Sequence, residues 1–358
     1  MRFKALGKLA AAVLGATVLG LGTLTAPAVA DPAPSTDYRI LSAIGSDTTQ
    51  YVMNAIANGP EVVNAGGAKI IASWDAVTPA GGADPFATKN PATNPSCLYS
   101  RTPATGGGNG TVLGSANGSR NGVERLVEDI NSFGYSCVDI ARSSRGPRQP
   151  GTALTYIPFA RDAFTYATDF GSQLPANFTR TQLRQIYLTC TFVDGTGALR
   201  AVQPLLPHDG SGLRSSWLEF LQITTPPDCV NQSVQPNDGT AIANGNQVMP
   251  YSVAQWISQG KGLTDVPNRR GESRLRAIDS VFPTTGAGAA LAINPAFTPA
   301  GDVYNVVQTS RLSEPAMYEA LVGGNSDVCR AAAVTVQTYG FLPSGQCGWT
   351  TLGGPLGW

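Results

Sequence analysis

The chain contains a single histidine, and its neighbours are residue types that a hydrolase site uses. His208 is followed by Asp209 and Ser211 in the stretch HDGSGLRSSW, which supplies the members of a Ser-His-Asp triad. Side chains that are adjacent in a strand or turn seldom face each other, so Asp209 is poorly placed to orient the ring. The serine lies in Asp-Gly-Ser-Gly and not in the Gly-x-Ser-x-Gly turn of many hydrolases. We therefore expect no catalytic residues here, and His208 to be a partly exposed turn residue.

Several turns combine glycine with small hydroxylated residues between a predicted strand and a predicted helix. They are residues 45–49 (GSDTT), 118–122 (GSRNG) and 209–212 (DGSG), with a further polar turn at 141–145 (ARSSR). The first N–H groups of a helix lack intrahelical partners and carry partial positive charge, hydroxyls add donors, and glycine lets the backbone approach closely. One such turn more often forms an ordinary helix cap. The four together favour the binding of an oxyanion.

The elements that position these turns follow from the hydrophobic pattern. Residues 38–45 predict a strand, and an amphipathic helix with Asp47 or Thr48 as its N-cap is predicted to follow it. A second helix is predicted to begin at Ser119, which would be its N-cap. Further strands are predicted at 69–74, 137–143, 153–169, 201–207 and 302–312, and further helices at 179–190, 212–221, 315–324 and 326–341. The repeated order of strand, turn and helix predicts α/β lobes with parallel or mixed sheets.

Two other stretches are interpreted as ordinary surface. Residues 64–114 are mostly Gly, Pro, Asn and Thr and predict long irregular loops. Within them the run 105–111 (TGGGNGT) is typical of a flexible loop, because no Gly-Lys-Ser/Thr follows as in a phosphate loop. Residues 266–281 (VPNRRGESRLRAIDSV) predict a basic patch on a loop and helix, typical of a solvated face.

The first thirty residues have the pattern of an export signal. Basic Arg2, Lys4 and Lys8 precede an apolar stretch that ends in an Ala-x-Ala site at Ala30. We expect cleavage near Ala30 and free secretion, since no cysteine follows the site to take a lipid anchor. Cleavage leaves 21 basic against 24 acidic residues, and this slightly acidic balance argues against a nucleic-acid partner. The roughly 330 remaining residues predict two lobes.

Six cysteines in an exported chain predict three disulfides. Six thiols allow 15 pairings, and we favour the sequential one because each pair then falls in a single segment bounded by loops: Cys97 with Cys137, Cys190 with Cys229, and Cys329 with Cys347. No metal site and no cofactor are expected, because the chain has one imidazole and no Cys-x2-Cys spacing.

In the order and spacing of these motifs the sequence resembles the phosphate-binding proteins of ABC phosphate importers, which are two-lobed periplasmic-type solute-binding proteins. The resemblance is carried by residues 43–56 (AIGSDTTQYVMNAI), 118–145 and 208–212 (HDGSG). It implies a type II periplasmic-binding-protein-like α/β fold with a hinge between the lobes. We place the first lobe at 37–165 plus 301–358 and the second at 166–300.

The resemblance also implies a function. The chain would capture an oxyanion in the cleft between the lobes, with inorganic phosphate favoured, for uptake through an ABC permease. We expect a monomer and no enzymatic activity. Two alternatives remain open: a secreted phosphate-ester hydrolase, and a non-transport extracellular protein that keeps the fold.

We expect the oxyanion to contact the four turns. Ser119, Ser211 and Gly212 match donors of the family, and Asp47 and Thr48 lie where its first turn offers donors. The complete set of expected binding residues is Ser46, Asp47, Thr48, Ser119, Arg120, Ser143, Ser144, Arg145, Asp209, Ser211, Gly212 and Arg214.

The sequence also departs from the family's pattern. Pro207 stands at the position of the anion-pairing arginine, Leu213 at that of a threonine, and Ser144 at that of the aspartate that accepts the proton kept by phosphate but not by sulfate. The choice between phosphate and sulfate therefore stays open, with Asp47 as a substitute acceptor. One or two of four arginines would supply the missing positive charge: Arg120, Arg142, Arg145 and Arg214. Of these we favour Arg145 and Arg214.

Overall fold

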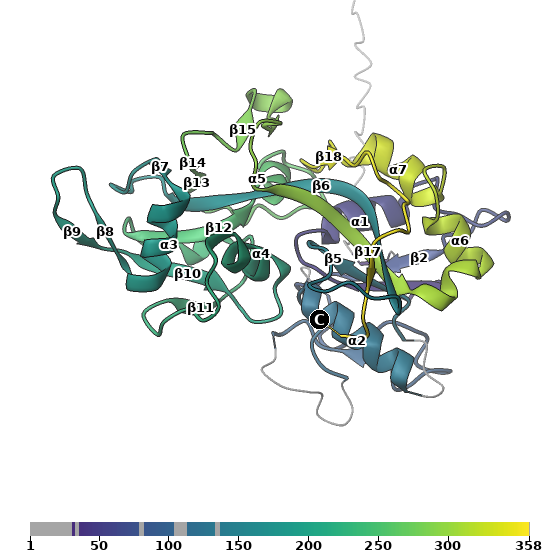
Figure 1. The fold of residues 1–358 in the computed structure, drawn as a ribbon. Helices are drawn as coiled ribbons and strands as arrows, with labels where there is room; N and C mark the ends of the chain where they lie inside the picture. Colours follow the sequence, from purple (N-terminus) through teal and green to yellow (C-terminus); the bar gives the residue numbers. More distant parts are fainter. Residues whose placement is uncertain (1–30, 33–35, 79–81, 104–112, 133–136, 358) are drawn as a thin grey trace, which may run out of the picture.

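The computed structural model describes residues 31–32, 36–78, 82–103, 113–132 and 137–357. Its central feature is a mixed sheet, whose strands lie in the order β11 (Asn231–Val234), β10 (Gln203–Pro207), β12 (Gln247–Ser252), β6 (Leu154–Asp169), β17 (Ala300–Gln308), β5 (Ile140–Ser143), β1 (Leu41–Gly45) and β2 (Ile71–Ser73). Three short strands also pair with β6: β13 (Ser273–Leu275), β18 (Leu342–Pro343) and β19 (Gly353–Gly354). Figure 1 shows the sheet passing through two groups of elements, so the predicted two-lobed α/β fold is confirmed.

Helices and small two-stranded ladders surround this sheet. The helices are α1 (Gln50–Asn58), α2 (Ser119–Asn131), α3 (Arg180–Thr189), α4 (Gly212–Leu221), α5 (Val253–Gln259), α6 (Pro315–Leu321) and α7 (Asp327–Thr335), with 3-10 turns η1 (Gly239–Ala241), η2 (Gly288–Ala290) and η3 (Thr309–Ser313). The ladders pair β3 (Phe86–Ala87) with β4 (Leu98–Tyr99), β7 (Asn177–Phe178) with β14 (Ala277–Ile278), β8 (Thr191–Val193) with β9 (Leu199–Ala201), and β15 (Thr284–Thr285) with β16 (Ala292–Ile293).

In the first lobe, parallel strands bring the ends of β1 and β5 to one edge of the sheet. Ala43 pairs with Ile140 in a parallel register. Leu41 and Ala43 pack in the same buried cluster as α1, whereas Ile44 packs with α2. This alternation buries both faces of β1. The turns that follow β1 and β5 consequently lie close together at the carboxyl edge.

Strand β6 connects the lobes. Its first part, residues 154–163, pairs antiparallel with β17, and its last part, residues 164–169, pairs with β12 and β13 of the second lobe. Figure 1 shows β6 and β17 as two long curved strands that run from one lobe to the other. After β17 the chain stays in the first lobe, where α7 packs on α1 and β6. The exact lobe boundaries given above stay a prediction.

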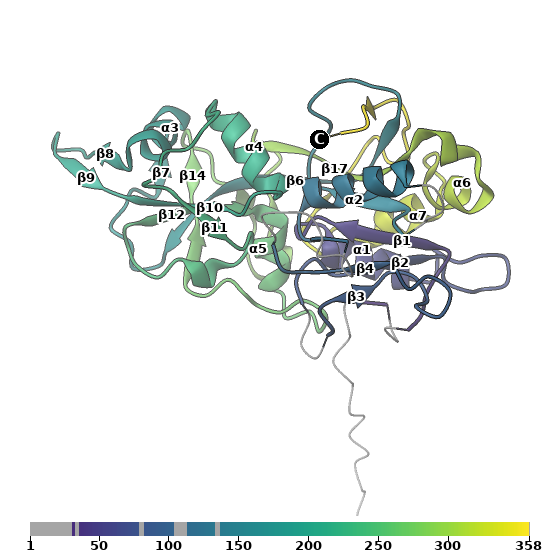
Figure 2. The ribbon, with the colours of Figure 1, turned by 90° about the horizontal axis from the view of Figure 1, so that it is seen from below.

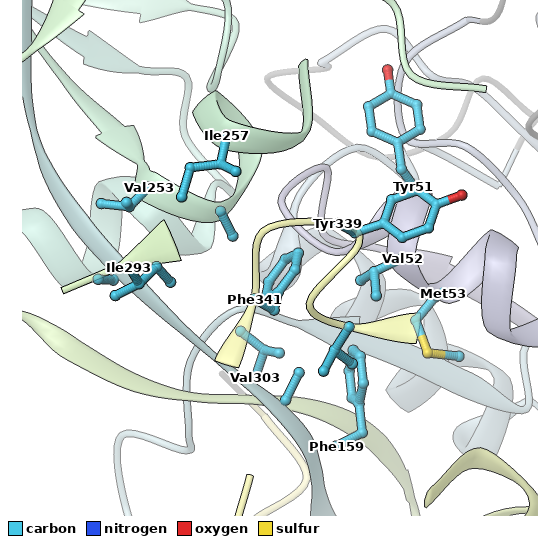
Figure 3. Close-up of a cluster of buried hydrophobic side chains, with 14 of the residues drawn as sticks. Tyr51, Val52, Met53, Phe159, Val253, Ile257, Ile293, Val303, Tyr339 and Phe341 are labelled. Carbon is cyan, nitrogen blue, oxygen red and sulfur yellow. The ribbon is translucent and has the colours of Figure 1, made fainter. Parts of the chain in front are cut away.

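A buried apolar cluster joins the lobes beside these strands. Figure 3 shows Phe341 lying between Val253 and Ile257 of α5 and Val52 and Phe159 from the first lobe. Phe341 is 2% exposed. One continuous core therefore extends across the junction of the two lobes on this side of the sheet.

The predicted disulfide pairing is confirmed. Bonds join Cys97 to Cys137, Cys190 to Cys229, and Cys329 to Cys347. The first lies in the first lobe, the second lies between the end of α3 and the loop before β11, and the third ties α7 to the C-terminal segment. In the described part of the chain, no disulfide joins one lobe to the other.

Two sequence expectations about local structure are wrong. The N-cap of α1 is Thr49 and that of α2 is Gly118, neither with a side-chain capping bond, because Asp47 and Ser119 make tertiary contacts instead. No helix forms at 266–281, where β13 and β14 lie, since pairing with β6 and β7 outweighs helix propensity.

The N-cap at Thr179 is confirmed as a capping box with Gln182. The run 105–111 lies outside the described residues.

Truncation of Phe341 tests the core at the junction. Phe341→Ala should lower the free energy of unfolding by about 3–5 kcal/mol, because it removes a large buried ring and leaves a cavity. Phe282→Ala, at a ring that is 60% exposed, should change it by less than about 0.5 kcal/mol. Urea unfolding followed by tryptophan fluorescence measures both. Equal effects of the two substitutions would contradict a shared core at the junction.

Candidate functional site

Three of the predicted turns converge from both lobes. Ser119 at the start of α2 accepts a hydrogen bond from the backbone N–H of Ser144 at 3.0 Å, and the two hydroxyl oxygens are 3.2 Å apart. Gly212, the first residue of α4, lies so close that a Cβ there would clash with both hydroxyls. The structure thus brings donors of Ser119, Ser144 and Gly212 to one place.

The backbones of the two lobes are in direct contact beside these residues. The N–H of Arg120 donates to the carbonyl oxygen of Gly210 at 3.0 Å. Gly118 and Gly210 both have positive φ, at 118° and 90°, and a Cβ on Gly118 would lie 2.5 Å from the Gly210 oxygen. Figure 2 shows α2 and α4 on either side of this junction. Glycine is required at Gly118 both by its conformation and by the approach of the other chain segment.

Ser46, Asp47 and Thr48, after β1, are buried at the junction. The Asp47 carboxylate accepts from Asn237 Nδ2 at 2.6 Å and from Arg269 Nη2 at 2.9 Å. The carbonyl of Thr48 accepts from Gln255 Nε2 at 2.6 Å. These partners all come from the second lobe, so this turn is the polar centre of the contact between lobes.

Arg269 has more donors than the protein satisfies. Nη2 donates a hydrogen bond to Asp47, while Nε and Nη1 are buried and have no partner among the described residues. Burial opposes the charge, but Tyr51 and Asp47 raise the pKa of the Arg269 guanidinium above its ordinary value. The side chain is therefore a cation with two buried nitrogen atoms that lack a hydrogen-bond partner among the described residues, an arrangement that an anion would complete.

The four arginines proposed from the sequence have protein partners. Arg142 is fully buried and donates to Ser73 and Trp74, and Arg120 pairs with Glu124 and Asp209. Arg145 pairs with Glu219, and Arg214 donates to the Pro207 carbonyl and to Gln232. Among them Arg145 alone lines the cavity described next.

A cavity of about 180 Å³ lies between the lobes. Three expected residues, Thr48, Ser144 and Arg145, line it. The other lining residues are Gly146, after β5, and residues of α4, β6 and β17: Asp162, Ala163, Phe164, Leu213, Ser216, Ala300, Gly301, Asp302 and Tyr304. Burial raises the pKa of Asp162 to about 6 although Ser252 and Ala254 donate to its carboxylate. The hydroxyls of Thr48 and Ser144 and the guanidinium come from turns, the hydroxyls of Ser216 and Tyr304 come from α4 and β17, and the carboxylates come from β6 and β17.

The remaining expected residues have mainly structural contacts. Ser143 ends β5 and its hydroxyl donates to the Arg145 carbonyl at 2.7 Å. The Ser211 hydroxyl accepts from the N–H of Arg214 and caps α4. Asp209 is largely exposed and pairs with Arg120. Ser211 thus serves as a helix cap, and its hydroxyl hydrogen remains available for a ligand.

His208 is buried, with 6% exposure, so the expectation of a partly exposed residue is wrong. Its Nδ1 lies 2.6 Å from the carbonyl oxygen of Asp209, while Nε2 has no partner in the part of the chain that the structure describes. A triad would need a carboxylate on Nδ1 and a serine hydroxyl on Nε2. The ring makes neither contact in this structure.

Sequence reasoning missed Arg269, Asn237 and Gln255. Arg269 belongs to the basic patch that is predicted to form a solvated face, and the Asn-Asp-Gly sequence that begins at Asn237 lies outside the predicted turns. Asn237 is fully buried with φ 55°, a left-handed conformation that asparagine tolerates better than most residues. The Asn-Asp-Gly sequence is a signal for this turn, whereas no local pattern indicates that Nε and Nη1 of Arg269 are buried.

Comparison with known proteins identifies the family. A family model described as PBP superfamily domain matches residues 75–340, well over half of the chain. The chain belongs to the PBP superfamily. No curated protein matches the sequence.

Solved structures show the same fold for this PBP superfamily member. An ABC-type phosphate transport receptor from Vibrio cholerae is 15% identical, with 85% of this chain and 100% of that chain covered and a TM-score of 0.50. A Clostridium perfringens structure, described as a phosphate ABC transporter substrate-binding protein with bound phosphate, is 14% identical, with 85% and 99% covered and a TM-score of 0.49. At these identities the likeness concerns the fold. Within the described residues of this PBP superfamily chain, no helix has the length and apolarity to cross a membrane.

Gly118 offers a test of the close contact between the lobes. Gly118→Ala and the control Gly67→Ala both place a side chain at positive φ, which costs about 1–2 kcal/mol. Only Gly118 faces the other lobe, because nothing lies within 4 Å of a Cβ at Gly67. Gly118→Ala should therefore also increase the radius of gyration measured by small-angle X-ray scattering, and Gly67→Ala should not. Unchanged scattering from both variants would contradict the contact.

Proposed function

We propose that this PBP superfamily member is a secreted solute-binding protein that captures a tetrahedral oxyanion, inorganic phosphate first, in the cleft between its lobes. The observation that carries the proposal is the buried guanidinium of Arg269, with Nε and Nη1 unpartnered. The converging hydroxyls of Ser119 and Ser144 and the start of α4 at Gly212 add neutral donors. The name of the Vibrio cholerae receptor supports phosphate as the ligand.

Binding would proceed by closure of the lobes around a dehydrated anion. The anion loses its water, and N–H and O–H donors from both lobes replace it. Because β6 and β17 are the long connections between the lobes, they would act as the hinge. Glycine at Gly118, Gly210 and Gly212 lets the two walls approach without intervening side chains. We propose binding without turnover, since His208 contacts neither a serine hydroxyl nor a carboxylate.

The export signal and the family resemblance extend this proposal to the cell. We propose that the chain is exported, acts outside the membrane as a monomer and delivers its ligand to an ABC permease. Arg145, Thr48 and Ser144 line the cavity between the lobes, which would be the entrance or part of the ligand site. Arg269 would provide the charge that Pro207 does not, and Arg145 would add to it.

A thermal-shift screen tests whether an oxyanion binds at all. The secreted protein is freed of carried-over ligand by partial unfolding and dialysis and is titrated with phosphate, arsenate, sulfate, molybdate and small organic anions. A ligand at about 100 times its dissociation constant adds about 2.7 kcal/mol of stability, so phosphate should raise the melting temperature by several degrees. No shift with any oxyanion would refute the proposed function, and steady turnover of a phosphomonoester would favour a hydrolase.

Replacement of Arg269 tests its role in the site. Arg269→Lys keeps a cation beside Asp47 but removes the planar fork and the Nε donor. Phosphate affinity should fall by about tenfold or more, the effect of losing about 1.4 kcal/mol or more, with little change in the melting temperature of the unliganded protein. The control is Arg276→Lys, whose guanidinium contacts Thr168 and Asp169 in the second lobe. Equal phosphate affinities for the two variants would remove Arg269 from the site.

A further inference from the structure

The cavity between the lobes adjoins the converging donors without enclosing them. Ser144 lines the cavity, and its hydroxyl oxygen is 3.2 Å from that of Ser119. Ser119 and Gly212 are not among the residues that line it. An oxyanion held by these donors would therefore lie at the Ser144 end of the cavity and would leave the rest of its volume open.

This volume is larger than an inorganic oxyanion needs. The cavity measures about 180 Å³, whereas one water molecule requires at least about 10–15 Å³. In the described part of the chain, nothing lies within 4 Å of a Cβ built on Gly301, a lining residue of β17. The cavity can therefore hold an organic group that is attached to the oxyanion.

The lining is negatively charged on the side of the strands that connect the lobes. Asp162 of β6 and Asp302 of β17 line the cavity. Among the described lining residues Arg145 is the one cation, and it pairs with Glu219 at 2.9 Å. The two carboxylates would repel a free inorganic anion and attract a cation.

Neither carboxylate forms a hydrogen-bonded ion pair among the described residues. Asp162 accepts from the Ser252 hydroxyl at 2.5 Å and from the Ala254 N–H at 3.0 Å, and both donors are neutral. Asp302 Oδ1 is buried without a hydrogen-bond partner, and the cation beside it, Arg161 Nε, is 3.8 Å away on a half-exposed side chain. Charge that is removed from water without compensation is unfavourable, so an ammonium group in the cavity would stabilise both carboxylates.

Two aromatic rings also belong to the lining. Phe164 packs T-shaped against Trp217, and Tyr304 packs T-shaped against Tyr156. These contacts hold the two rings in fixed orientations. Aromatic ring faces attract organic ammonium groups, so rings and carboxylates together favour a ligand with a positive charge on its organic part.

We propose that the site binds an organic phosphate ester or phosphonate that carries an ammonium group, with its oxyanion at the converging hydroxyls of Ser119 and Ser144 and its ammonium group in the cavity. This inference rests on the proposed function and names the class of oxyanion that binds more tightly than inorganic phosphate. The carboxylates of Asp162 and Asp302 would compensate the ammonium charge.

Matched ligands test this inference on the full exported chain, freed of carried-over ligand. O-phosphoethanolamine and aminopropyl phosphate carry the ammonium group on spacers of different length, and ethyl phosphate and propyl phosphate are their counterparts without it. In isothermal titration at least one aminoalkyl phosphate should bind about tenfold more tightly than its counterpart and than inorganic phosphate, the effect of about 1.4 kcal/mol. Failure of both to exceed either reference would overturn the inference.

Removal of one carboxylate tests the position of the ammonium group. Asp302→Asn keeps the shape of the side chain and should lower the ratio of aminoalkyl to alkyl phosphate affinity by about fivefold, the effect of about 1 kcal/mol. The control Asp228→Asn makes the same change of charge at an exposed position before β11 and should leave the ratio as it is. The same ratio in both variants would place the ammonium group outside this cavity.

Filling the cavity tests the position of the organic group. Gly301→Val places a branched side chain in the open volume and should weaken alkyl and aminoalkyl phosphates by about tenfold relative to inorganic phosphate. Gly324→Val, between α6 and α7, is the control, because nothing lies within 4 Å of a Cβ there either. Unchanged relative affinities in Gly301→Val would contradict the inference.

The outcomes separate the two proposals. If the unaltered protein binds neither inorganic nor organic phosphates, the proposed function fails and this inference fails with it. If inorganic phosphate binds and the aminoalkyl phosphates bind no more tightly, the proposed function stands and only the assignment of the ligand class is lost.

Discussion

The buried carboxylate of Asp47 is the constraint on which the junction of the lobes depends. A carboxylate removed from water is unfavourable unless charge and hydrogen bonds compensate it. Its partners Asn237 and Arg269 lie 190 and 222 residues further along the chain, in the second lobe. In the proposed opening of the lobes, water would solvate Asp47 and Arg269 again. The closed arrangement would therefore gain little net free energy from this pair, and the proposed ligand, through the remaining Arg269 donors, would decide the balance.

The same constraint explains the local structure of the second lobe. Asn237 donates to Asp47 and Thr48, and its own oxygens accept from Ser252, Tyr251 and Gln259. This saturated residue takes a left-handed conformation. The bonds hold the segment after β11 against the start of α5, so the position of Arg269 is set by a network rather than by one contact. Such networks lose much of their stability when one member is missing.

The sequence predicted the elements of this fold well and the site only in part. Strands β1, β5, β6, β10 and β17 have apolar patterns that depend on near neighbours, and the turns with Ser119, Ser144 and Gly212 follow them directly. The N-caps at Asp47 and Ser119 were wrong because partners distant in the sequence engage these side chains. Arg269 resembled a surface arginine for the same reason, since its burial depends on Asp47. The contact between the His208 ring and the Asp209 carbonyl oxygen depends on the conformation of this turn. The spacing of residues in the sequence does not predict it.

The placement of the disulfides has a consequence for how the molecule moves. The bonds are Cys97–Cys137, Cys190–Cys229 and Cys329–Cys347, and each links parts of the same lobe. Oxidation therefore reinforces each half separately and sets no limit on the angle between them. With the proposed export, oxidation of the six cysteines would leave the proposed hinge motion free, and reduction of the disulfides would destabilise each lobe without changing the contacts between the lobes. The disulfides thus stabilise the interior of each lobe, whereas the proposed motion depends on the strands that connect the lobes.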